Sequence, residues 1–217
     1  MTGLFITFEG PDGAGKTTQV EAFARALRQQ GYDVLVTREP GGTPLSDKIR
    51  ALLLDPAHKE MADATEVLLY AAARAQHVQE KVIPALQNGR IVVCDRFVDA
   101  SIAYQGYGLG LAVAEIVEIN RFAAAGLQPD RTYLLDIPVS VGRLRLGQRE
   151  RLDRIEQKGE QYHQRVRNGF RQIAEQYPQR VRLIDANRSI EQVHAEIMAD
   201  FQAWQAANQV ARKGELG

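Results

Sequence analysis

Short apolar runs alternate with longer amphipathic segments along most of the chain. The apolar runs are rich in β-branched residues and lie at Phe5–Phe8, Val34–Thr37, Ile91–Asp95, Thr132–Asp136 and Val181–Asp185. Between the first two, Lys16–Gln30 places Val20, Phe23, Ala24 and Leu27 on one face at helical spacing. Continuously apolar strands that alternate with helices are typical of a parallel sheet covered on both faces. The pattern therefore predicts an α/β fold with a five-stranded parallel sheet.

Each predicted strand ends in a polar cluster. These clusters are Gly10–Thr18, Thr37–Thr43, Asp95–Phe97, Asp136–Pro138 and Asp185–Asn187. The carboxyl ends of parallel strands meet at one edge of a sheet, and ligands of open α/β sheets bind there. We therefore expect the five clusters to form the rim of one active site.

Length and charge place the chain among ordinary globular proteins. Its 217 residues suit a single domain over 1–217, in which we expect residues 205–217 to be a frayed helix end. Its 27 basic and 27 acidic residues give a formal net charge of zero, which argues against nucleic acid as a partner. No apolar run reaches the length of a membrane span, and Met1–Phe8 is too short for a signal peptide. Cys94 is the only cysteine, which fits a reducing compartment, so we expect a cytoplasmic protein.

The first polar cluster matches the phosphate-loop pattern G-x-x-x-x-G-K-[ST] at Gly10, Gly15, Lys16 and Thr17. Its glycines let successive backbone N–H groups turn toward an anion, and the helix that follows adds the positive end of its dipole. We expect Lys16 to reach the β- and γ-phosphates and the Thr17 hydroxyl to bind Mg²⁺. The predicted ATP-binding residues are Gly10, Pro11, Asp12, Gly13, Ala14, Gly15, Lys16, Thr17 and Thr18.

The remaining clusters narrow the class of phosphate-loop protein. No strand is followed by the Asn-Lys-x-Asp sequence of guanine-specific proteins, and no strand ends in the paired acids of motor ATPases. Instead, Asp95 can help to hold Mg²⁺, and Arg96 beside it offers a guanidinium fork that suits a phosphate. Arg38 offers a second fork at the next strand end. Two arginines facing the phosphate loop predict an acceptor that itself carries a phosphate.

Five segments in order, EGPDGAGKTT, TREPGGT, CDRF, AYQG and LDRIEQ, resemble thymidylate kinase of the bacterial form. The similarity spans Leu4 to about Val193, and TREPGGT and AYQG are far more specific than the phosphate loop. It implies the fold of the P-loop nucleoside monophosphate kinases, with a mobile lid. It also implies transfer of the γ-phosphoryl group of ATP to dTMP, giving dTDP and ADP, with Mg²⁺ as cofactor and a homodimer as the assembly.

The resemblance assigns roles to residues of the acceptor site. It implies that Asp12 contacts the sugar or phosphate of dTMP and the metal, and that Arg38 and Arg96 bind the phosphate of dTMP. It also implies that Tyr70 stacks on thymine and that Arg74 hydrogen-bonds the edge of the base; the two are four residues apart and share a helical face. Without the resemblance, an aromatic residue at helical spacing would be read as core.

The resemblance further implies that Ser101, Tyr104 and Gln105 line the deoxynucleotide pocket. The ring of Tyr104 beneath the sugar would leave no room for a 2′-hydroxyl. Where the family continues QGGGRG, this chain has Tyr107 and Leu109 in place of a glycine and an arginine. The change could affect phosphate contacts, the subunit interface or the mouth of the pocket.

An arginine-rich segment follows the fourth predicted strand. Residues 143–157 carry Arg143, Arg145, Arg149, Arg151 and Arg154, and such a charge run is usually a solvated helix face. By resemblance it is a lid that closes on the phosphates of ATP. Since the phosphate loop contains no arginine, we predict that Arg149 and Arg151 supply the catalytic positive charge.

Two other interpretations stay open from the sequence. The chain could be a kinase for another nucleotide or a small metabolite, or a nucleotide-binding subunit without catalysis. The intact Asp12, Lys16 and Asp95 argue against the second. No histidine pair shows zinc-ligand spacing with Cys94, so we interpret the four histidines as structural or surface residues and Cys94 as a buried thiol.

Overall fold

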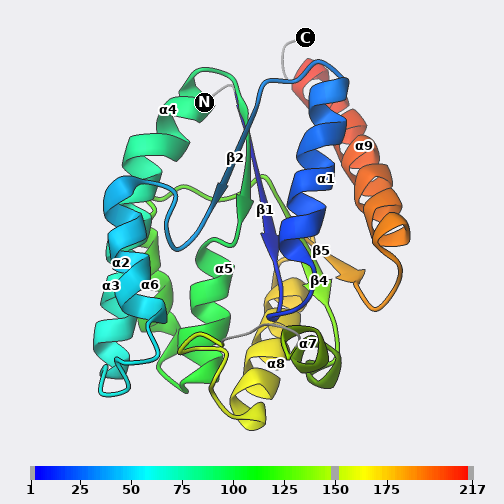
Figure 1. Cartoon of the computed structure of the whole chain (residues 1–217). Coiled ribbons are helices and arrows are strands. Elements are labelled where there is room, and N and C mark those ends of the chain that lie inside the picture. Colours follow the sequence, from blue (N-terminus) through cyan, green and yellow to red (C-terminus); the bar gives the residue numbers. More distant parts are fainter. Residues whose placement is uncertain (1–2, 148–151, 215–217) are drawn as a thin grey trace.

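The computed structural model of the chain describes residues 3–147 and 152–214. A five-stranded parallel sheet, with strand order β2-β3-β1-β4-β5, lies between two layers of helices (Figure 1). The strands are β1 (Leu4–Glu9), β2 (Val34–Arg38), β3 (Ile91–Asp95), β4 (Arg131–Asp136) and β5 (Val181–Asp185). Each predicted strand is confirmed to within one residue at either end, as is the parallel α/β class.

The helices connect the strands in chain order. They are α1 (Lys16–Gln29), α2 (Pro44–Leu54), α3 (Asp63–His77), η1 (Val78–Val82), α4 (Ile83–Gln87), α5 (Val98–Ser101), η2 (Ile102–Gly108), α6 (Val113–Ala123), α7 (Val139–Leu146), α8 (Glu160–Gln176) and α9 (Ile190–Gly214). Helix α1 buries Val20, Phe23, Ala24 and Leu27, the face that its spacing predicted.

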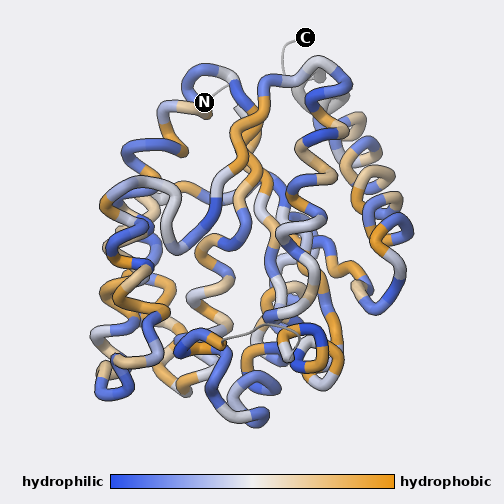
Figure 2. The backbone as a smooth tube through the Cα atoms, viewed as in Figure 1, coloured by the Kyte–Doolittle hydropathy of each residue, from blue (hydrophilic) through white to orange (hydrophobic). Residues whose placement is uncertain are grey.

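The two faces of the sheet bury separate apolar clusters, and the strands form the most hydrophobic part of the chain (Figure 2). On one face, Phe8 and Tyr133 of the sheet pack against Phe23 of α1 and Phe201 of α9. On the other, η1, α4, α5, η2 and α8 cover β1, β3 and β4. Because both faces are covered, the strands are largely apolar along their length, and the functional groups come from strand ends, loops and helices.

The chain order of the strands reverses at β1. From β1 the chain passes over β3 to β2 and returns, and it then crosses to β4 on the other side. Such a reversal leaves a crevice at the carboxyl end of the central strand. Residues 10–15 of the phosphate loop lie at this point, between β1 and α1.

Two segments, η1 and η2, are π-helices rather than regular α-helices. The segment after α5 is a π-helix, η2, in which the N–H of Leu109 bonds to the carbonyl of Tyr104. A π-helical turn is wider than an α-helical one and is frequent at functional sites. At the other end of the chain, α9 continues past Trp204 to Gly214. Gln205 donates to the hydroxyl of Tyr32 at 3.0 Å, which ties this part of α9 to the loop after α1.

Candidate active site

The phosphate loop joins β1 to α1 in a conformation that only glycines adopt without strain. Gly10 and Gly13 have φ angles of 136° and 78°. A Cβ on Gly10 would lie 2.2 Å from the carbonyl oxygen of Leu135, and one on Gly13 would lie 2.6 Å from that of Gly142. The loop therefore passes so close to β4 and α7 that any side chain at these two positions would displace it.

Lys16 is folded back over this loop. Its Nζ donates to the carbonyl oxygens of Gly10 and Pro11 at 3.0 and 2.9 Å, and the side chain is buried. Burial, together with the nearby Arg96 guanidinium, lowers the pKa of Lys16 to about 8. A phosphate placed in the loop would restore the charged form, because the loop then holds an anion beside the ammonium group.

Two oxygen groups meet beside the loop. The Thr17 hydroxyl donates to Oδ2 of Asp95 at 2.7 Å, which joins the start of α1 to the end of β3. Mg²⁺ prefers oxygen ligands and, in phosphate-transfer sites, uses one or two protein groups together with phosphates and waters. No cluster of three or more acidic, histidine or cysteine side chains suited to a metal occurs in the described part of the chain. The pair of Thr17 and Asp95 fits a metal that is held mainly by the nucleotide.

Asp12, Arg96 and Tyr104 form one hydrogen-bonded group. Nη2 of Arg96 lies 2.5 Å from Oδ1 of Asp12 and 3.0 Å from the Tyr104 hydroxyl, which in turn donates to Oδ2 of Asp12 at 2.8 Å. Burial alone would raise the pKa of Asp12, but Arg96 and Lys16 outweigh it and lower the pKa. Arg96 has a φ of 72°, which is unusual for a residue with a side chain. This strain turns its guanidinium back toward the phosphate loop.

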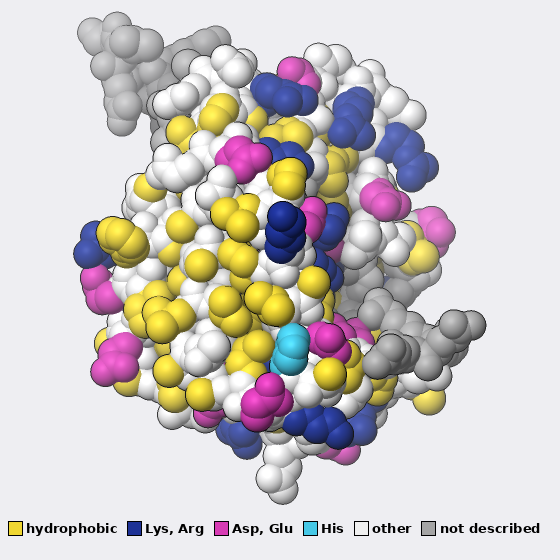
Figure 3. Space-filling model, turned by 60° about the vertical axis from the view of Figure 1, so that its left-hand side comes forward, with side chains coloured by type: hydrophobic (Ala, Val, Ile, Leu, Met, Phe, Trp, Pro, Cys, Tyr) yellow, Lys and Arg dark blue, Asp and Glu magenta, His cyan; other side chains and the backbone are white. Residues whose placement is uncertain are grey.

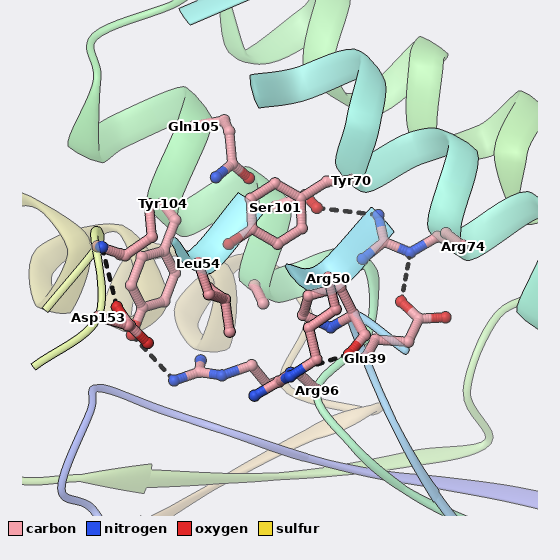
Figure 4. Close-up of a pocket in the computed structure, with 13 residues that line it drawn as sticks. Glu39, Arg50, Leu54, Tyr70, Arg74, Arg96, Ser101, Tyr104, Gln105 and Asp153 are labelled. Carbon is pink, nitrogen blue, oxygen red and sulfur yellow. Dashed lines mark hydrogen bonds and ion pairs between the residues drawn. The ribbon is translucent and has the colours of Figure 1, made fainter. Parts of the chain in front are cut away.

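A pocket opens between α2, α3, η2 and the segment that precedes α8 (Figure 4). Its lining consists of Glu39, Pro40, Arg50, Leu54, Tyr70, Arg74, Arg96, Ala100, Ser101, Tyr104, Gln105, Asp153 and Ile155. Six of the predicted acceptor-site residues line it: Tyr70, Arg74, Arg96, Ser101, Tyr104 and Gln105. It combines two tyrosine rings, an amide and three guanidinium groups with apolar side chains, a composition that suits a phosphorylated base and sugar.

Arg38 is not among these residues, although the sequence predicted it in the acceptor site. Its side chain is 54% exposed and pairs with Asp47 at 3.0 Å. The reason is the alternation of the strand. Thr37 and Glu39 both hydrogen-bond His77 on the α3 side, so the residue between them points the other way.

Arg50 lines the pocket, although it was not among the predicted site residues. It reaches the pocket from α2, and its Nη1 donates to the carbonyl of Pro40 at 2.9 Å. Burial and the neighbouring guanidinium of Arg38 lower the pKa of Arg50. Arg50 and Leu54 are one helical turn apart and both line the pocket. Their spacing in the sequence predicts that they share a helical face, which a prediction based on strand ends alone does not consider.

Arg74 is held by a buried network. It donates to Oε2 of Glu39 at 2.7 Å and to the Ser101 hydroxyl and the Phe97 carbonyl at 2.9 Å each, and it also bonds Oδ1 of Asn120. These contacts use four of its five N–H groups. One N–H on Nη2 has no hydrogen-bond partner among the described residues, and Arg74 lines the pocket.

A second pocket lies on the opposite side of the phosphate loop. It is lined by Gly13, Gly15, Thr18, Gln19, Arg145, Arg188 and neighbouring apolar residues. Nη1 of Arg145 donates to the Gly13 carbonyl at 3.1 Å, and Arg188 follows β5. Thus one arginine of the predicted lid contacts the loop from α7.

The rest of the predicted lid divides into three parts. Arg149 and Arg151, the predicted catalytic arginines, lie outside the described residues. Arg143 is exposed on α7. Arg154 is anchored by its backbone N–H to Leu54 and by its side chain to the carbonyl of Leu53 and to Glu66.

Three further residues of the site were missed by the sequence argument. Asp153 and Ile155 enter the acceptor pocket, and Glu9, at the end of β1, accepts from the Phe97 N–H at 2.6 Å through Oε1. Burial, followed by the charge of Asp99, raises the pKa of Glu9 to about 8. Glu9 directly precedes the phosphate loop, and an acid at the end of a buried strand was the available signal.

Comparison with known proteins agrees with these features. The model of the thymidylate kinase family matches residues 8–197. The chain is 54% identical to thymidylate kinase of Exiguobacterium sibiricum over 200 residues, which cover 92% of this chain and 94% of the relative. It is 53% identical to the enzyme of the same name from Ectopseudomonas mendocina over 199 residues, or 92% and 95% of the two chains. The crystal structure of thymidylate kinase from Ehrlichia chaffeensis superposes with a TM-score of 0.75 at 34% identity, covering 93% of this chain and 99% of that one. On sequence and on structure alike, the chain belongs to the thymidylate kinase family.

Proposed function

We propose that the two pockets on either side of the phosphate loop hold the two substrates of one reaction. In it the γ-phosphoryl group of ATP is transferred to dTMP, giving dTDP and ADP. The activity is that of the family to which the chain belongs. The observation that supports the arrangement most strongly is the bond between Asp12 of the phosphate loop and Arg96 of the acceptor pocket, because it brings the two phosphate sites together.

The acceptor pocket offers one group for each part of dTMP. The phosphate would lie between the guanidinium groups of Arg50 and Arg96, the sugar against Tyr104, and the base against the ring of Tyr70. Each arginine can form paired hydrogen bonds with a phosphate. Arg38 stays a candidate for this phosphate only if it leaves Asp47.

On the donor side, the loop from Gly10 to Thr17 would bind the phosphates of ATP through its backbone N–H groups and Lys16. Lys16 would exchange its bonds to the Gly10 and Pro11 carbonyls for bonds to phosphate oxygens. Thr17 and Asp95 would hold Mg²⁺, whose positive charge would offset the negative charge of the phosphates during transfer. Catalysis then rests on positioning and on charge, because phosphoryl transfer needs little further chemistry from the protein.

The lid and the compartment are further proposals. Arg149 and Arg151 would approach the γ-phosphate from the segment after α7, as the absence of arginine from the phosphate loop suggests. We place the reaction in the cytoplasm, on the ground that the one cysteine, Cys94, is a buried thiol without a disulfide partner. Among the described helices, none is long and apolar enough to cross a membrane.

We also propose a homodimer through the face formed by α2, α3 and α6. Large apolar side chains gather on this face (Figure 3), and Leu68 and Phe122 are 60% and 86% exposed. Leu45 and Leu52 of α2 are about half exposed beside them. An exposed apolar face suits the self-complementary interface of a two-fold dimer. Sedimentation of the wild type and of Leu68→Glu combined with Phe122→Glu tests this: a wild type that sediments as a monomer contradicts the proposal.

One experiment tests the reaction itself. A coupled assay presents ATP and Mg²⁺ with dTMP, dUMP, dCMP, UMP and AMP in turn. We expect dTMP to have the highest kcat/KM and UMP to be poor, since in the proposed arrangement the Tyr104 ring would leave no room for a ribose 2′-hydroxyl. Preference for another acceptor would favour a kinase for a different nucleotide, and inactivity with every acceptor would favour a binding protein.

A further inference from the structure

Gln105 faces the acceptor pocket with an amide that can present either of two opposite chemical groups. A side-chain amide has a carbonyl oxygen that accepts and an NH₂ group that donates, and rotation by 180° exchanges them. Facing the pocket, the oxygen would bind a base that donates from its ring nitrogen, whereas the NH₂ would bind one that accepts there. The orientation of this amide therefore decides which pyrimidine the pocket recognises.

A buried carboxylate sets that orientation. Nε2 of Gln105 donates to Oε1 of Glu66 at 2.9 Å, and Glu66 is fully buried in α3. The other oxygen of Glu66, Oε2, lies 2.8 Å from Nη2 of Arg154 and 3.5 Å from Nζ of Lys158. Paired with two cations, Glu66 is an acceptor only, so Gln105 must turn its NH₂ group toward it.

The carbonyl oxygen of Gln105 is then left for the ligand. In Figure 4 the amide points into the pocket, with its oxygen on the side of Tyr70. No donor among the described residues hydrogen-bonds this oxygen, although the side chain as a whole is only 2% exposed. Glu66, Tyr70 and Arg74 follow one another at intervals of four along α3, so they lie along one side of this helix, and Tyr70 and Arg74 line the pocket.

We propose that Glu66 is a positioning residue that gives the pocket its preference for thymine over cytosine. By fixing the NH₂ of Gln105, it leaves an acceptor for the N3–H group of thymine. Arg74 lines the same pocket, and its remaining N–H suits the adjacent carbonyl oxygen. Cytosine has a bare ring nitrogen and an amino group at these two places, so both contacts would be mismatched. The inference rests on the proposed function.

The variant Glu66→Gln makes a specific prediction. Arg154 and Lys158 can only donate, so the oxygen of the new amide must face them and its NH₂ must face Gln105. Gln105 would then turn its own oxygen away from the pocket and offer NH₂ to the base. We expect the ratio of kcat/KM for dTMP to that for dCMP to fall at least tenfold, because the reoriented amide would weaken the binding of thymine and strengthen the binding of cytosine.

Internal controls separate this effect from damage to the fold. Uracil carries the same N3–H and carbonyl groups as thymine, so the ratio of dTMP to dUMP should stay within twofold. Lys158→Gln removes one cation but keeps the acceptor, and should leave the ratio of dTMP to dCMP unchanged. In a Gln105→Leu background, Glu66→Gln should no longer alter that ratio, because the amide through which it acts is absent.

The outcomes are distinct. A wild type that does not phosphorylate dTMP overturns the proposed function. An active wild type whose preference survives Glu66→Gln, or an effect that persists in the Gln105→Leu background, overturns the role of Glu66. If Glu66→Gln does not fold, NMR of the wild type decides the question. On addition of dTMP the ¹³Cδ resonance of Gln105 should shift while its ¹⁵Nε2 resonance hardly moves, and the reverse would refute the proposal.

Discussion

Replacing Arg50 with methionine tests which arginine receives the phosphate of dTMP. Arg50 enters the acceptor pocket and, within the described residues, donates a hydrogen bond only to the Pro40 carbonyl. Arg38 is more than half exposed and is paired with Asp47. The matched variants Arg50→Met and Arg38→Met each remove one guanidinium and keep an apolar stem of similar length, so they differ mainly in the position of the lost charge.

The structure sets the expected size of each effect. A hydrogen bond to a charged group contributes about 1.5–3 kcal/mol, and a factor of ten in affinity corresponds to about 1.4 kcal/mol. Arg50→Met should therefore raise the Kd for dTMP by about 10- to 150-fold. An exposed ion pair contributes about 0–1 kcal/mol, so Arg38→Met should change the Kd by less than about fivefold.

The free energy of unfolding should behave differently from the affinity. Burial and the charge of Arg38 lower the pKa of Arg50, which means that the charge of Arg50 is unfavourable in the unliganded pocket. Its removal relieves this repulsion and loses the bond to the Pro40 carbonyl, two changes that act in opposite directions on the free energy of unfolding. The unliganded variant should thus be about as stable as the wild type, as expected for a residue that serves the ligand.

Calorimetric titration with dTMP, calorimetric titration with ADP and urea unfolding without ligand measure the three quantities. The expected result is weaker binding of dTMP by Arg50→Met, with the Kd for ADP and the free energy of unfolding nearly unchanged. The reasoning fails if Arg38→Met weakens dTMP binding as much as Arg50→Met does. It also fails if Arg50→Met weakens both nucleotides equally, since that would indicate a structural role.

Three further predictions follow from the site. Tyr70→Ala should raise the KM for dTMP more than tenfold and leave that for ATP almost unchanged, because stacking on a base is worth about 1–3 kcal/mol; equal changes in steady-state assays would indicate a core residue. Arg149→Ala combined with Arg151→Ala should lower the single-turnover rate at least a hundredfold at unchanged dTMP affinity, and a loss below fivefold would mean that Lys16 and the metal suffice. The pKa of Glu9 is raised from 4.5 to about 8, so between these pH values the folded protein keeps a proton that the unfolded chain releases. The free energy of unfolding therefore falls as pH rises through this range, by up to about 1.4 kcal/mol per pH unit. Glu9→Gln should flatten that slope in urea unfolding at pH 5, 6.5 and 8, and an unaltered slope would show that Glu9 is already ionised at pH 5.

The groups that meet phosphate could be predicted because their place in the fold is fixed by local rules. A phosphate loop has to follow a buried strand and begin a helix, and both are visible as patterns in the sequence. Lys16, Thr17, Asp95 and Arg96 were therefore located correctly at the carboxyl ends of β1 and β3. The same reasoning placed Cys94 inside β3, where it is buried and where burial raises the pKa of its thiol.

Arg38 shows where local rules are insufficient. The sequence places it at a strand end, but the direction of its side chain depends on which neighbours the strand buries. Thr37 and Glu39 face His77, which is about forty residues away along the chain. That pairing belongs to the packing of α3 on β2, so it cannot be read from the TREPGGT segment alone.

Glu66 illustrates the same limit more strongly, and gives the physical reason for it. A carboxylate that is fully buried is costly unless cations and donors surround it, and here they come from η2 and from the segment before α8, 39 and 92 residues away for Gln105 and Lys158. In the sequence Glu66 reads as one polar residue in the first turn of a helix, where an acid is favourable in any case. Only the tertiary fold makes it the partner of Gln105. Residues that bind substrate through a motif can thus be found from the chain alone, whereas residues that orient those binders become visible once the long-range contacts are known.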